Sequence, residues 1–183
     1  MTGIRLDQFD NSGYQPGSTV LRALWYVAMP IFLSGTIPWP YGVKRATLRL
    51  FGAHVGRGVV IKPHVRIKYP WKLSVGNHSW IGESVWIDNL DQVTIGHHCC
   101  ISQGALLLCG NHDYTSSTFD LITRTIVMED GSWVGAKSIL GPGSVLGKEA
   151  VLAVGSVGLG HLQPHHIHQG NPAKPIRPRD ITP

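Results

Sequence analysis

The chain has 183 residues, 43% of them hydrophobic and 15% charged, and a formal net charge of +5. This composition can bury a core and excludes a disordered chain, while dispersed basic residues and the lack of a nucleic-acid-binding motif argue against a nucleic-acid partner. The three cysteines show neither disulfide nor metal spacing, which fits a reducing compartment. We therefore expect a cytoplasmic protein of one domain with an extension.

Residues 1–54 predict an N-terminal arm and a helical cap. Residues 1–17 lack any periodic pattern, whereas residues 18–34 and about 41–52 are predicted to form two short helices separated by Ile37-Pro38-Trp39-Pro40. Residues 18–34 are apolar, but Arg22 and Pro30 make them a poor membrane span. The segment either caps the fold or touches the surface of the inner membrane, and the sequence leaves both readings open.

A six-residue repeat dominates residues 55–163. An aliphatic residue recurs in fourteen units, at Val55, Ile61, Ile67, Val75, Ile81, Ile87, Ile95, Ile101, Leu107, Met128, Val134, Leu140, Leu146 and Leu152. Four residues after the aliphatic, a small or β-branched residue stands in eleven of the fourteen units. Every third unit is lengthened by two residues in the early part of the chain, so that one turn takes twenty residues.

This repeat predicts an all-β solenoid, a parallel β-helix shaped as a triangular prism. Each hexad supplies a short strand and a corner, the aliphatic residue points inward, and the small residue fits the tight corner. The handedness of the coil does not follow from the repeat. We expect the chain from residue 164 to 183 to form a tail along the outside of the prism.

An insertion interrupts the repeat after Leu107, because the next unit begins at residue 128 instead of 115. The inserted loop spans about residues 110–126 and opens with His112, which Asn111 and Asp113 flank. Asp88 and Asn89 belong to the same edge one turn earlier. Loops on a rigid scaffold often carry function, and a general base needs an orienting neighbour and an acceptor hydroxyl within reach. His112 is therefore our candidate catalytic base.

Several motifs resemble the hexapeptide sugar O-acetyltransferases, and more narrowly the colanic-acid biosynthesis acetyltransferase group. They are the Asn-His loop opening, Asp130-Gly-Ser-Trp133-Val-Gly135, Gly155-Ser-Val, Gly170-Asn-Pro-Ala-Lys174-Pro-Ile-Arg177, Leu6-Asp-Gln-Phe-Asp-Asn11, Ile67-Lys-Tyr-Pro-Trp71, Trp86-Ile-Asp-Asn89 and Cys100-Ile-Ser-Gln-Gly104. The resemblance implies a left-handed coil, acetyl-CoA as co-substrate, a saccharide acceptor and a homotrimer with sites between prisms. It implies no metal and no covalent intermediate.

The same resemblance implies a role for each matching residue. His112 would remove a proton from the sugar hydroxyl that attacks the thioester, and Cys109 is not needed as a nucleophile. The substrate-binding candidates are Asp88, Asn89, Asn111 and Asp113. The CoA-binding candidates are Trp133, Ala136 and Val154 for the pantetheine arm, and Lys174 and Arg177 for the phosphates. The chain departs from the family at Gly160, where a lysine that helps bind CoA usually stands.

Three other readings stay open. A metalloenzyme on the same fold, like the γ-class carbonic anhydrases, needs a His-x4-His pair, and Ser117 stands where the second histidine would follow His112. A non-catalytic scaffold would fit the loss of the lysine at Gly160. An N-acetyltransferase acting on a nucleotide-linked amino sugar would use the same scaffold. The run from His165 to His168 has no clear family parallel, and we expect it to be solvated.

Overall fold

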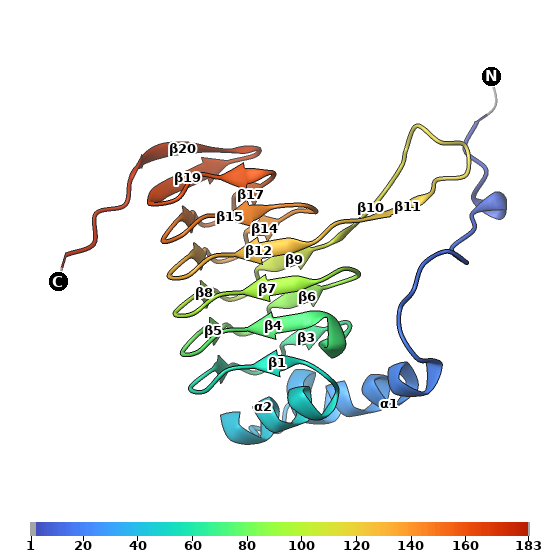
Figure 1. Cartoon of the computed structure of the whole chain (residues 1–183), viewed down its shortest axis with the longest axis horizontal. Coiled ribbons are helices and arrows are strands. Elements are labelled where there is room, and N and C mark those ends of the chain that lie inside the picture. The colour runs from blue at the N-terminus through green and yellow to red at the C-terminus, as the bar shows by residue number, and fades with distance from the viewer. Residues whose placement is uncertain (1–2, 183) are drawn as a thin grey trace.

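The computed structural model describes residues 3–182 and consists of a helical cap, a β-solenoid and a projecting hairpin (Figure 1). The N-terminal arm contains the 3₁₀ turn η1 (Leu6–Gln8). The cap contains α1 (Thr19–Met29), the π-helical turn η2 (Pro30–Ser34) and α2 (Tyr41–Leu50). Both predicted helices are confirmed. No helix among residues 3–182 is long and apolar enough to cross a membrane.

Three parallel sheets form the sides of the solenoid. Sheet A contains β1 (His54–Val55), β4 (Leu73–Val75), β7 (Val93–Ile95), β12 (Ile126–Met128), β15 (Val145–Leu146) and β18 (His161–Leu162). Sheet B contains β2 (Val60–Ile61), β5 (Trp80–Ile81), β8 (Cys100–Ile101), β13 (Trp133–Val134), β16 (Val151–Leu152), β19 (His166–Gly170) and β20 (Ala173–Pro178). Sheet C contains β3 (Arg66–Ile67), β6 (Trp86–Asp88), β9 (Leu106–Leu108), β14 (Ile139–Leu140) and β17 (Val157–Gly158).

The predicted inward column forms the core. All fourteen aliphatic residues of the repeat are buried, none more than 7% exposed, and each stacks in register on its equivalent in the next turn, as Ile61 does on Ile81. Burying one such side chain contributes about 1.5–3 kcal/mol before chain entropy is subtracted. The six-residue period therefore predicted the fold class correctly. The left-handed sense of the coil stays a prediction from the family resemblance.

The small residues of the repeat fill the corners as predicted. All eleven are buried, and the Ser79, Ser138 and Ser144 hydroxyls bond to the backbone of the next turn. The Ser79 hydroxyl donates to the Gly96 carbonyl at 2.7 Å, and the Ser138 hydroxyl donates to the Ala153 carbonyl at 2.7 Å. A buried hydroxyl is costly without such a partner, so serine fits these corners only because the adjacent turn presents a carbonyl.

The cap closes the open end of the first turn by donating hydrogen bonds to it. The Trp25 indole N–H donates to the Ile67 carbonyl at 2.8 Å, and the Lys44 ammonium donates to the Ile61 and Lys62 carbonyls, each at 3.1 Å. Arg49 donates to the Val55 carbonyl at 2.6 Å. These groups satisfy the carbonyl edge that the first turn would otherwise expose.

The solenoid runs further than the aliphatic pattern indicates. Strand β19 pairs in parallel with β16, and β20 folds back on β19 in antiparallel pairing. Within β19, His168 occupies the inward position next to Leu152 and is only 2% exposed, with its Nε2 2.9 Å from the Gln163 carbonyl. Our expectation of an external, solvated tail from residue 164 is therefore wrong. Polar His168 takes the place of an aliphatic residue, so the spacing of aliphatic residues does not reveal this unit.

The insertion forms an antiparallel hairpin of β10 (Gly110–His112) and β11 (Leu121–Thr123). It leaves the solenoid where the chain passes from sheet C to sheet A, which we call the C/A corner. Figure 1 shows the hairpin projecting sideways and the N-terminal arm rising from α1 to meet its tip. The Arg5 backbone N–H donates to the Ser117 carbonyl at 2.8 Å, which joins the two segments.

Candidate active site

His112 lies on the first strand of the hairpin, directly opposite Leu121. The hairpin starts close to the turn below, because a side chain at Gly110 would come within 2.4 Å of Leu90 Cδ1. Only glycine fits there without displacing Leu90. The glycine therefore lets the hairpin leave the prism wall tightly, and it sets His112 two residues from that wall.

Phe119 orients the imidazole of His112. The Nδ1 atom lies 2.8 Å from the Phe119 carbonyl oxygen, and the two rings stack with centroids 4.4 Å apart at 7°. A carbonyl can only accept, so Nδ1 carries the proton and Nε2 keeps its free lone pair. Phe119 achieves this with a φ of 54°, a region that bulky residues seldom adopt and that often marks functional sites. The histidine is thus held in the tautomer that a general base requires.

The N-terminal arm builds one wall of a cavity beside this histidine. The Phe9 ring lies 5.6 Å from that of His112, and the Tyr14 hydroxyl donates to the Leu90 carbonyl at 2.6 Å. Burial is the main cause that raises the pKa of the Tyr14 phenol, which keeps this donor protonated. The cavity measures about 320 Å³, and Arg22, Lys68 and Tyr69 also line it. It has room for a small polar substrate next to His112.

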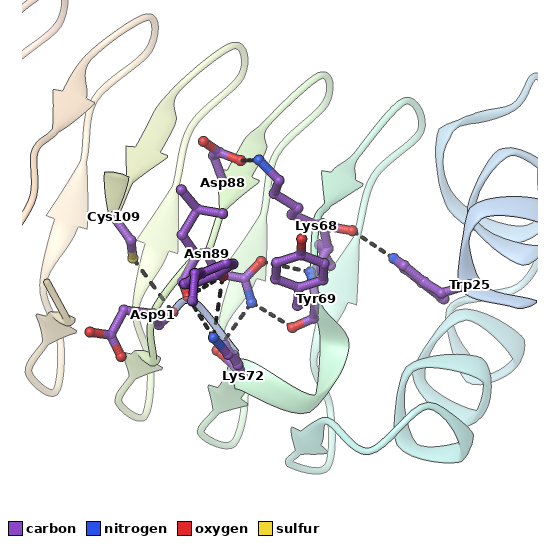
Figure 2. Close-up of polar contacts among 11 residues, drawn as sticks. Trp25, Lys68, Tyr69, Lys72, Asp88, Asn89, Asp91 and Cys109 are labelled. Atoms are coloured by element: carbon purple, nitrogen blue, oxygen red, sulfur yellow. Dashed lines mark hydrogen bonds and ion pairs between the residues drawn. The ribbon is translucent and has the colours of Figure 1, made fainter. Parts of the chain in front are cut away.

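Asp88 and Asn89 are adjacent in sequence but have different surroundings (Figure 2). Asp88 is 2.9 Å from the Lys68 ammonium and lines a second cavity beside α1. Asn89 is fully buried: its Oδ1 accepts from the Tyr69 N–H, and its Nδ2 donates to the Tyr69 and Lys72 carbonyls. Asn89 therefore ties two successive C/A corners together, and our expectation that it contacts the acceptor is not supported.

Asn111 and Asp113 stabilise the hairpin itself. Asn111 Oδ1 accepts from the His112 backbone N–H at 2.8 Å, and Asp113 accepts from the N–H and hydroxyl of Thr115. The hydrogen bond from the Thr115 side chain is the main cause that lowers the pKa of Asp113. Neighbours along a strand point to opposite faces, and neither residue lines the cavity that His112 lines. The structure does not bring them to the reactive nitrogen.

The five CoA-binding candidates lie on sheet B and at the corner between sheets B and C. Trp133 is 42% exposed and donates to the Ser102 hydroxyl at 2.8 Å. Ala136 and Val154 sit in successive turns of that corner, joined by the Gly155 N–H to the Ala136 carbonyl at 3.0 Å. Lys174 and Arg177 are exposed on β20. The strand register places Trp133, Val151, Ile167 and Arg177 side by side on four neighbouring strands of sheet B. At three strand spacings, Trp133 and Arg177 lie roughly 14 Å apart.

Sheet C separates these candidates from His112 within one chain. His112 leaves the C/A corner, whereas Ala136 and Val154 lie at the corner between sheets B and C. Gly160, where the family lysine is missing, lies in the C/A corner with a φ of 67°, and a Cβ at this position would meet open space. One copy therefore presents the candidate base at one edge of the prism and the candidate CoA-binding residues around another.

Sequence reasoning missed the residues that surround His112. Phe9, Tyr14 and Arg22 carry no pattern that links them to it, because contacts across about a hundred residues leave no local periodicity, and the positive φ of Phe119 has no signature in the sequence. Cys109 lies close in sequence, but it is fully buried, and burial raises the pKa of its thiol to about 11. Within residues 3–182, no three His, Cys, Asp or Glu side chains gather into a group that could hold a metal ion.

Known proteins of the same architecture identify the class. No protein-family model matches the sequence. The chain is 34% identical over 170 residues, 93% of each protein, to the putative colanic acid biosynthesis acetyltransferase WcaF of Escherichia coli K12. It is 23% identical over 137 residues to the galactoside O-acetyltransferase of the same organism, covering 73% of this chain and 68% of that enzyme.

Solved structures show the same fold. A hexapeptide-repeat acetyltransferase of Vibrio cholerae, crystallised with acetyl-CoA, superposes with a TM-score of 0.82 at 19% identity, covering 96% of this chain and 97% of that one. A maltose O-acetyltransferase of Clostridium difficile 630 superposes with a TM-score of 0.82 at 18% identity, covering 96% of each chain.

The solenoid, its interrupted third turn and these matches define an acetyltransferase. The chain belongs to the hexapeptide-repeat acetyltransferase family. Within that family, the similarity to the putative colanic acid biosynthesis acetyltransferase WcaF spans 93% of the chain. The family resemblance expected from the sequence is therefore confirmed, and the non-catalytic reading is set aside.

Proposed function

We propose that the protein is an O-acetyltransferase that moves the acetyl group of acetyl-CoA to a sugar hydroxyl during synthesis of a colanic-acid-like exopolysaccharide. The observation that carries this proposal is the orientation of His112, whose Nδ1–H is committed to the Phe119 carbonyl while Nε2 stays free beside a cavity. The full-length similarity to WcaF supports the assignment to polysaccharide synthesis.

The proposed reaction is a direct transfer. His112 Nε2 accepts the proton of the sugar hydroxyl as its oxygen attacks the thioester carbonyl carbon. Backbone N–H groups would stabilise the oxyanion. The carbon–sulfur bond then breaks, and the imidazolium returns its proton to the CoA sulfur. Cys109 takes no part, because a buried thiol with a pKa of about 11 holds almost no thiolate near neutrality.

We assign Asp88 as the acceptor contact and give Asn89, Asn111 and Asp113 structural roles. Asp88 is 7% exposed, and its Oδ1 forms the Lys68 ion pair but no hydrogen bond. A sugar hydroxyl could donate to this carboxylate in the second cavity. Trp133, Ala136 and Val154 would flank the pantetheine arm, and Lys174 and Arg177 would bind the CoA phosphates.

The separation of the candidate base from the candidate CoA-binding residues supports a homotrimer. A cyclic trimer lets the hairpin of one prism reach the sheet B region of its neighbour. An aromatic residue on the outer face of sheet B, Trp80, is 56% exposed in the single chain. Burying it between prisms would favour assembly. Each trimer would then hold three equivalent acetyl-CoA grooves.

Residues 18–34 also support peripheral contact with a membrane. Val20, Leu24 and Val27 follow one another at helical spacing and are 68%, 57% and 60% exposed. An apolar stripe on a short amphipathic helix suits the interface of a bilayer. Sedimentation with lipid vesicles checks this: Leu24→Asp/Val27→Asp should lose vesicle binding, and equal binding by the variant would remove the proposal.

The central experiment measures thiol release from acetyl-CoA with a panel of sugar acceptors for wild type and His112→Ala. We expect turnover to fall by about 10²–10⁴-fold in the variant, with CoA binding kept. His54→Ala is the matched control, since His54 is exposed on the outer face of sheet A. Equal turnover by His112→Ala and wild type would refute the role of His112.

A further inference from the structure

A second cavity adjoins the one beside His112. It measures about 390 Å³ and lies between α1 and sheet C. Arg22, Lys68 and Tyr69 line both cavities, so the two lie side by side between the imidazole and the helical cap, and we call them together the recess. A single sugar beside His112 would leave the second cavity for another part of the same acceptor.

Positive charge dominates the second cavity. Arg22, Arg66 and Lys68 contribute three cations, and Asp88 pairs with Lys68 alone. Within residues 3–182, no carboxylate pairs with Arg22 or Arg66. The Arg66 guanidinium instead lies 4.5 Å from the centroid of the Trp86 ring, which holds it against the cavity wall.

Arg22 contains a buried donor without a partner. Its Nε is shielded from solvent and makes no hydrogen bond, whereas its Nη2 donates to the Thr19 hydroxyl at 3.1 Å. A guanidinium that no carboxylate neutralises is unfavourable beside a burying wall, and an anionic oxygen is its strongest hydrogen-bond partner. A fork of two arginines matches the several oxygens of a phosphate better than the single charge of a carboxylate.

We propose that the acceptor is a sugar esterified to phosphate or diphosphate, with the anion bound by Arg22 and Arg66 while the sugar hydroxyl reaches His112. This inference rests on the proposed function for the sugar end of the recess. The phosphate oxygens would accept from the guanidinium groups of Arg22 and Arg66. The shared chemistry is a phosphoester, whether its other end is a nucleoside or a polyprenyl lipid.

The first test is calorimetric binding of inorganic pyrophosphate to the intact protein at saturating CoA, which occupies the CoA phosphate site. Binding should weaken about 10- to 100-fold in Arg22→Gln and Arg66→Gln, with partial rescue in Arg66→Lys. Arg57→Gln is the control, because Arg57 is exposed and lines neither cavity. Equal binding by all variants, or none by wild type, would overturn the inference.

The second test compares acceptors by thiol release: methyl glucoside, glucose 1-phosphate, glucuronate, UDP-glucose and a short-chain polyprenyl diphosphate-linked glucose. A kcat/KM at least about 10-fold higher for the phosphoesters than for methyl glucoside and glucuronate supports the inference, and the last two compounds separate the nucleotide and lipid sources. Equal values for free and phosphorylated sugars overturn it while leaving the proposed function intact. No thiol release with any acceptor counts against the proposed function, and pyrophosphate binding still tests the cavity.

Analytical ultracentrifugation of the arginine variants tests whether the substitutions change the assembly state of the protein. If Arg22→Gln or Arg66→Gln changes the assembly state of the protein, the cavity is a contact between copies, and the inference is wrong. An unchanged assembly state with weakened pyrophosphate binding supports it.

Discussion

The corners of the prism differ in how they satisfy their backbone. At the corner between sheets B and C, every turn has one of the small or β-branched residues of the repeat, and Ser138 among them bonds the next turn. At the C/A corner the first turns are longer, and individual side chains join successive turns: Asn89 binds Tyr69 and Lys72, and Lys72 donates to the Leu90 carbonyl at 2.7 Å. Repetition gives the prism a regular frame, and the irregular corner places the proposed base, His112, on that frame.

The comparison predicts that damage to the prism and damage to the C/A corner have different signatures. Core substitutions should lower stability and leave catalysis per folded molecule unchanged. Corner substitutions should lower catalysis and leave global stability nearly unchanged.

Ile101→Ala should have the largest effect on stability. Ile101 is fully buried in the middle of sheet B, between Ile81 and Val134. Removing its side chain leaves a cavity that should lower the free energy of unfolding by about 2–5 kcal/mol. Urea denaturation measures this, and kcat at low temperature should match wild type. A large fall in kcat with unchanged stability would contradict the division between prism and corner.

Phe119→Gly should separate catalysis from stability. Glycine adopts a positive φ freely, so the folded state should lose little stability or gain up to about 1 kcal/mol. The variant loses the ring stacked on His112, and we expect kcat to fall about 10-fold as the imidazole loosens. Thermal unfolding measures the change in stability, and steady-state kinetics measure the fall in kcat. Full activity would show that the ring does not position the base.

Phe9→Ala should weaken binding of the acceptor and leave binding of acetyl-CoA unchanged. The arm closes one side of the cavity beside His112, and removing its ring opens that wall. We expect KM for the acceptor to rise about 3- to 10-fold, a loss of about 1 kcal/mol of binding, while KM for acetyl-CoA stays constant. Phe32→Ala, which alters an aromatic pair of the cap at Trp39, provides a control outside the recess. Parallel changes in both KM values would argue against an acceptor wall.

Cys109 should have the smallest effect, visible only in alkali. Its pKa is raised to about 11 by burial in the folded chain, so folding favours the thiol form. The stabilising contribution is complete below the ordinary thiol pKa and is lost as pH rises through about 11. Cys109→Ala should therefore reduce the loss of stability measured by denaturation between about pH 9 and 11. Identical pH profiles would show that this thiol is not linked to folding.

Local repetition explains how much of this molecule can be predicted from sequence. The hexads repeat a single environment, so they predicted the inward column and the small-residue corners, and the break in rhythm pointed to His112. His168 escaped detection because a polar residue fills an inward position at the end of the prism. The arm, Phe119 and the buried role of Asn89 depend on distant partners or an unusual φ, which no short pattern encodes.

The most direct test of the shared site is complementation between two inactive chains. The proposed trimer places His112 of one copy against the candidate CoA-binding residues of another, so His112→Ala and Lys174→Glu/Arg177→Glu should each be inactive alone. Co-expressed and co-purified as mixed trimers, they should regain about a third of wild-type thiol release, because each mixed trimer has about one site in three with both parts intact. Mixed trimers that stay inactive would show that each site draws both parts from one chain, and would contradict the proposed trimer.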